Sequence, residues 1–131
     1  MATQEYFDSI AKGLRDLWPA GEKDGKYPWR DSVGNLSKRL KFLWENRDMK
    51  EYSIDACLTV GRKYLAQFET NAKYMKLLKY FIFKQNKLVG KDGKITYTYQ
   101  STFADMLENQ SSLELEEDIE VLFDNQQGEL I

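Results

Sequence analysis

The chain has 131 residues, enough for one domain with a hydrophobic core of its own. Hydrophobic residues make up 42% of it and aromatic residues 14%, a composition typical of globular rather than disordered proteins. Histidine is absent and Cys57 is the single cysteine, which excludes an intrachain disulfide, a histidine-containing catalytic triad and a Cys/His structural zinc site. No pair of carboxylates stands out as a catalytic pair either. We therefore expect a binding protein that is not an enzyme and uses no cofactor or metal.

The N-terminal segment lacks the features of a secretory signal, because Glu5 and Asp8 interrupt its apolar residues. The longest apolar cluster is residues 80–83, far shorter than the roughly 18 apolar residues that suggest a membrane span. These observations predict a cytoplasmic protein without membrane association.

In chain order, the first expected elements are a helix and a loop. Apolar residues recur at helical spacing over residues 4–17, and Pro19 ends that helix. The loop that follows contains Tyr27 and Trp29. We expect these two rings, with Trp18, to hold the loop against the body.

Two further helices are predicted by apolar stripes at steps of three and four residues. The second spans residues 32–46, with Asp31 or Ser32 as its N-cap. The third begins after Ser53, another good cap, and includes Gly61, where a neighbouring helix can approach closely.

The pattern then predicts a fourth helix over residues 71–84 and a β-hairpin near residues 87–99. Asp-Gly at 92–93, flanked by β-prone residues, is a strong hairpin signal. Ser101 or Thr102 can cap a short fifth helix.

The sequence thus predicts a mainly α domain of about five helices with one β-hairpin over residues 1–109. Residues 110–131 form an acidic and hydrophobic tail with seven carboxylates and no lysine or arginine. Since the whole chain has a net charge of −2, residues 1–109 carry +5. The expected core comprises Leu36, Leu40, Leu43, Ile54, Leu58, Leu65, Phe68, Leu77, Leu78 and Phe81.

A basic stretch at residues 73–94 contains seven lysines and one acid, Asp92. Lysines at such spacing can contact successive phosphates, and aromatic rings among them can stack on bases. A helix followed by a hairpin also resembles the element order of winged-helix DNA-binding domains, with residues 71–84 as recognition helix and residues 91–93 as wing tip. The alternative is an ordinary solvated lysine face. The predicted nucleic-acid-binding residues are Lys73, Lys76, Lys79, Tyr80, Phe83, Lys84, Lys91 and Lys94.

In the tail, acidic residues alternate with apolar ones, and Ile119, Leu122 and Phe123 are its predicted partner-binding residues. Residues 118–123 resemble the short acidic-hydrophobic peptides that dock on sliding clamps, although the usual leading glutamine is absent. Small late-transcription coactivators of tailed phages end in a similar tail, and this resemblance would place the protein in the host cytoplasm. The alternative is a C-terminal helix that packs these residues and Leu115 onto the body, since their spacing is also helical.

We therefore predict a small accessory or regulatory protein whose basic helix and hairpin face nucleic acid. Its tail would recruit a protein partner or cover the basic face. Two alternatives remain. One is a protein–protein interaction module, such as a virion component or an inhibitor of a host or defence protein, without nucleic-acid binding. The other is a homo-oligomer in which the tail inserts into a neighbouring subunit.

Overall fold

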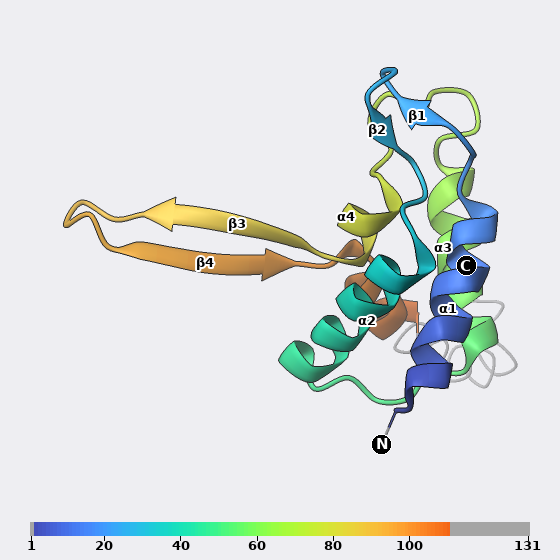
Figure 1. The fold of residues 1–131 in the computed structure, drawn as a ribbon, viewed down its shortest axis with the longest axis horizontal. Coiled ribbons are helices and arrows are strands. Elements are labelled where there is room, and N and C mark those ends of the chain that lie inside the picture. The colour runs from blue at the N-terminus through green and yellow to red at the C-terminus, as the bar shows by residue number, and fades with distance from the viewer. Residues whose placement is uncertain (1, 111–131) are drawn as a thin grey trace, which may run out of the picture.

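The computed structural model describes residues 2–110, in which packed helices carry one long projecting hairpin (Figure 1). The first three helices are α1 (Gln4–Leu17), α2 (Val33–Arg47) and α3 (Ile54–Ala66). Helix α1 packs against both α2 and α3. Gly61 of α3 lies against α1, where an added Cβ would come within 2.8 Å of the Leu14 side chain. The expected close approach at this glycine is confirmed.

Each of these helices begins at a residue whose side chain accepts a free backbone N–H, as N-caps do. Thr3, Ser32 and Ser53 accept from the amides of Tyr6, Asn35 and Ala56. Of the two N-cap candidates for α2, Ser32 is therefore the cap.

The segment after α1 forms a small hairpin that the sequence did not suggest, of β1 (Glu22–Lys23) and β2 (Tyr27–Pro28). Trp18 and Trp29 are buried, as expected. The expectation for Tyr27 is wrong, because this side chain points to solvent and does not anchor the segment.

The predicted fourth helix is much shorter than expected. Only α4 (Leu78–Ile82) is helical, and residues 71–77 form a turn and an extended loop. Tyr74, expected on the apolar face of that helix, is exposed. The long recognition helix of the winged-helix interpretation is therefore absent from the observed structure.

The second hairpin is present and longer than predicted. Strand β3 (Lys84–Val89) pairs antiparallel with β4 (Ile95–Gln100), with Val89 opposite Ile95. Gly93 has φ 79°, a left-handed conformation that suits the tight turn. In Figure 1 the hairpin extends away from the helices along its whole length.

Residues 102–110 return to the body as a fifth helix. The Ser101 side chain accepts from the Ala104 amide at 2.9 Å, which confirms one of the two caps expected here. Arg47 on α2 forms ion pairs with Asp105 and Glu108, at 2.7 and 2.9 Å. The predicted mainly α fold with a β-hairpin is confirmed. No helix in the described part of the chain is long and apolar enough to cross a membrane.

The core lies where α1, α2, α3, α4 and the fifth helix meet, and aromatic rings pack around Phe81 within it. The Phe81 ring lies 4.9 Å from Trp18, 4.6 Å from Tyr64 and 5.5 Å from Phe103, measured between ring centroids. Six of the expected core residues are buried, and Ile54 is exposed instead. The other three, Leu58, Leu65 and Phe68, are partly buried at the edge of the core.

Candidate nucleic-acid interface

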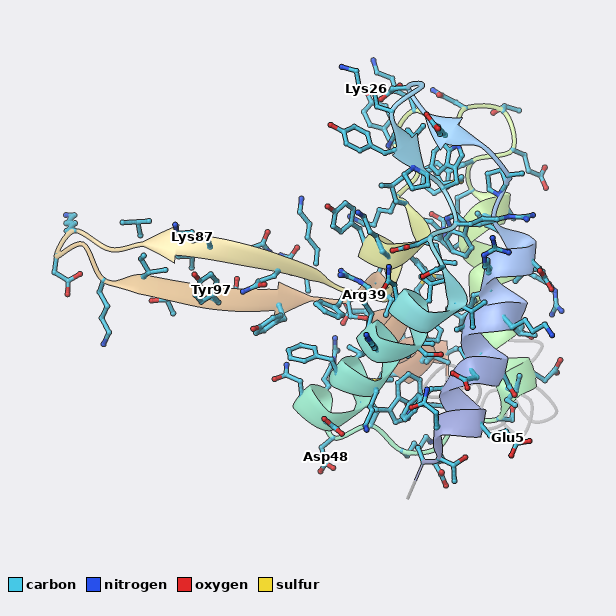
Figure 2. The ribbon with its side chains drawn as sticks, viewed as in Figure 1. Glu5, Lys26, Arg39, Asp48, Lys87 and Tyr97 are labelled. Atoms are coloured by element: carbon cyan, nitrogen blue, oxygen red, sulfur yellow. The ribbon has the colours of Figure 1, made fainter. Side chains whose placement is uncertain are left out.

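An open groove of about 540 Å³ lies between the β1–β2 hairpin and the segment that leads into α4. Its volume is within the range of ligand sites, about 300–1,000 Å³. Lys26, at the tip of the β1–β2 hairpin, is labelled near it in Figure 2. The groove is lined by Lys23, Asp24, Tyr27, Lys73, Tyr74, Met75, Lys76, Leu77, Tyr80 and Lys84.

Long-range hydrogen bonds hold the wall of the groove at residues 73–77 in its extended shape. Lys23 Nζ donates to the Met75 carbonyl at 2.7 Å, and Trp18 Nε1 donates to the Lys76 carbonyl at 3.1 Å. The Lys76 amide donates to the hydroxyl of Tyr64 at 2.8 Å. These partners satisfy backbone groups that would otherwise bond within a helix. The first half of the helix expected over residues 71–84 is therefore replaced by a loop, residues 71–77, whose side chains reach the groove.

The groove is strongly basic. Four lysines line it against one carboxylate, that of Asp24. Lys73, Lys76 and Lys84 form no ion pair with any residue between 2 and 110. Their charges are therefore available to an anionic ligand that carries several phosphates.

Three tyrosine rings accompany these lysines. Tyr27 is 54% exposed, Tyr74 73% and Tyr80 39%. Lys73 Nζ lies 5.4 Å from the ring centroid of Tyr74, and Lys79 Nζ lies 5.0 Å from that of Tyr80. Exposed rings beside cations are the arrangement on which bases stack while phosphates meet positive charge.

The structure brings together half of the residues predicted for nucleic-acid binding. Lys73, Lys76, Tyr80 and Lys84 line the groove. Lys79 does not line it, but contacts the ring of Tyr80.

Sequence reasoning missed three residues of the groove, Lys23, Tyr27 and Tyr74. Lys23 and Tyr27 lie in a segment that was interpreted only as an anchored loop, and Tyr74 was assigned to a helix. Lys23 contacts a carbonyl 52 residues further along the chain. No local pattern carries such information. Their residue types, lysine and tyrosine, were the only available signal.

Phe83 does not line the groove. It packs at the base of the β3–β4 hairpin. Its ring lies 4.9 Å from that of Phe42, and the guanidinium carbon of Arg39 is 4.1 Å from its centroid. Arg39 also donates hydrogen bonds to the carbonyls of Lys79 and Phe83, so that it fastens the hairpin to α2 (Figure 2). Burial lowers the pKa of this guanidinium from its ordinary value. Phe83 and Arg39 thus connect the hairpin to the body.

Lys91 and Lys94 are at the far end of the hairpin. Six strand residues at about 3.3 Å each place them about 20 Å from its base. They are therefore separated from the groove, and Lys84 alone belongs to both the groove and the hairpin.

Two other kinds of site, a metal site and a cysteine nucleophile, can be compared with the described residues. Between residues 2 and 110, no three His, Cys, Asp or Glu side chains come together as a metal site would require. Cys57 is buried, and burial raises the pKa of its thiol to about 12. A thiol that stays protonated is a poor nucleophile.

No family model, curated protein or solved structure matches this chain. The likeness to winged-helix domains and to phage coactivators therefore remains a resemblance of element order and tail composition. The predicted partner-binding residues Ile119, Leu122 and Phe123 lie outside the described residues.

Proposed function

We propose that the protein is a non-catalytic accessory protein that binds single-stranded nucleic acid in the groove between the β1–β2 hairpin and residues 73–84. The observation that supports this function best is the combination, in one open groove, of four lysines and three exposed tyrosines. Lysines attract the phosphates, and tyrosine rings stack on bases of any sequence.

A single strand fits these residues better than a duplex. Bases in a duplex are already stacked on one another, so exposed rings gain little from it. Arginine, the commonest reader of base edges in a duplex, does not line the groove. The proposed binding is therefore insensitive to sequence.

Fluorescence anisotropy tests this proposal with labelled oligothymidylate, oligouridylate and a DNA duplex across a salt series. We expect the single strands to bind more tightly than the duplex. The logarithm of affinity should fall with the logarithm of salt concentration by about 0.7 for each phosphate contacted.

Two variants separate charge from stacking. Lys73→Gln with Lys76→Gln should weaken binding and reduce the salt slope by about 1.4, for two lost phosphate contacts. Tyr74→Ala should cost about 1–3 kcal/mol of binding and leave the slope unchanged.

The matched control is Lys12→Gln with Lys38→Gln, which removes the same charge from exposed positions on α1 and α2 outside the groove. This control should bind nearly as tightly as the parent chain. Equal weakening in control and groove variants would contradict the groove assignment. Absence of binding at low salt would contradict the function and favour the alternative, a protein–protein interaction module.

A further inference from the structure

The β3–β4 hairpin has an unpartnered apolar face. Opposed residues share a face, so the register places Val89 with Ile95, Lys87 with Tyr97 and Gln85 with Tyr99 on one side. Four of these six are large hydrophobic side chains that remain exposed: Val89, Ile95, Tyr97 and Tyr99.

This face continues onto the body. The ring of Tyr99 lies 5.1 Å from that of Phe42 on α2, beside a hollow of about 210 Å³ that Phe83 and Arg47 also line. A two-stranded hairpin is marginally stable by itself in water. An exposed apolar strip along its length indicates that another segment covers it.

The chain contains a segment with a matching pattern. From residue 113 to residue 124, apolar side chains occupy the odd positions and acidic ones the even positions, with only Glu117 and Leu122 as exceptions. A period of two is the pattern of a β-strand with one apolar face. The apolar positions of this segment are Leu113, Leu115, Ile119, Val121 and Phe123.

We infer that residues 119–123 dock at one edge of the hairpin of the same chain as a third strand, with Ile119, Val121 and Phe123 on the same side of the sheet as its apolar face. A two-stranded sheet has two free edges, along which backbone N–H and C=O groups can pair with a further strand. The charges also match. The hairpin carries four lysines and one aspartate, and the tail carries seven carboxylates and no basic residue.

The end of the described chain lies one short helix away from the hairpin. The fifth helix starts at the base of the hairpin and ends at Gln110, whose side chain accepts a hydrogen bond from Lys63 of α3, and its nine residues are about 14 Å long. Residues 111–118 can span about 26 Å when extended. The hairpin is about 20 Å long, so Ile119, Val121 and Phe123 can reach its apolar face without help from a second molecule.

The test is hydrogen exchange of the full-length chain, without nucleic acid, followed by mass spectrometry. We expect the amides of residues 84–100 and 119–123 to exchange at least about tenfold more slowly than those of an unstructured chain. Val121→Asp should abolish this protection in the tail, because residue 121 lies on the apolar face of the three-stranded sheet. Leu122→Asp adds the same charge at the neighbouring position, on the opposite face, and should retain it.

The outcomes separate the alternatives. Loss of protection in Leu122→Asp but not in Val121→Asp would show a helix packed on the body and overturn the strand. Rapid exchange of the tail in the parent chain would overturn docking altogether. Protection that weakens on dilution would show that the tail comes from another copy, which also overturns docking within one chain. This inference does not rest on the nucleic-acid proposal, since the assay contains none.

Discussion

In the helical body, aromatic rings from distant parts of the chain surround Phe81, and the buried side chains that carry polar atoms have hydrogen-bond partners. In the β3–β4 hairpin, eleven of the twelve strand residues are exposed, including four large hydrophobic ones on one face. The same chain therefore contains a region held by its own packing and a region that gains most from a partner. The difference teaches that the apolar residues of the body stabilise the fold by packing against one another, whereas those of the hairpin are left for a further segment, which we infer to be the tail.

The largest expected effect on the free energy of unfolding comes from comparing two aromatic truncations, one in the helical body and one in the hairpin. Phe81→Ala should lower the free energy of unfolding by about 3–5 kcal/mol, because it leaves a cavity among three rings. Tyr97→Ala on the hairpin should cost about 1 kcal/mol, since that ring is half exposed and has only the inferred third strand beside it. Urea denaturation followed by circular dichroism measures both. Similar losses would remove the distinction between body and hairpin.

A smaller loss of stability is expected from substituting Arg39, which lies at the junction of the body and the hairpin. Arg39→Ala removes the donors that hold the carbonyls of Lys79 and Phe83, which should cost about 2–3 kcal/mol. Arg39→Lys should recover only part of the loss, because an ammonium group lacks the planar fork that reaches both carbonyls. Hydrogen exchange at residues 79–84 checks whether the junction loosens. Unchanged exchange and stability in Arg39→Ala would contradict its role as the fastening of the hairpin.

The smallest expected effect on the free energy of unfolding comes from raising the pH, and it arises from buried groups of the helical body. Burial raises the pKa of the Cys57 thiol to about 12, and burial also raises the pKa of the Tyr6 and Tyr64 hydroxyls. The folded state therefore retains protons that the unfolded chain releases. Stability is fully present below about pH 9, the ordinary pKa of a thiol, and is lost as pH rises toward the folded value.

Urea denaturation at several pH values between about pH 8 and pH 10 measures this dependence. Cys57 alone should contribute a loss of about 1.4 kcal/mol for each pH unit above its unfolded pKa. Cys57→Ala serves as the control, because it removes this titration and should flatten the dependence by that amount. An equally steep decline in Cys57→Ala would show that Cys57 is not the cause.

Local sequence signals predicted a substantial part of this fold. The apolar periodicity of α1, α2 and α3, the caps Ser32, Ser53 and Ser101, and the Asp-Gly turn of the hairpin each act over a few residues. Such features express backbone preferences and side-chain spacing that hold in almost any context. Three of the four groove lysines, Lys73, Lys76 and Lys84, were visible in the sequence as part of a basic stretch.

The sequence by itself determined α1, α2, α3 and the fifth helix, the hairpin turn, and the opposite charges of the basic stretch and the tail. Only the tertiary structure decided that residues 71–77 leave the helix, because Trp18, Lys23 and Tyr64 satisfy their backbone groups from far away in the chain. It also decided which aromatic residues are exposed, and so brought Tyr27 and Tyr74 to one groove. Burial depends on contacts between distant segments, and no local pattern specifies those contacts.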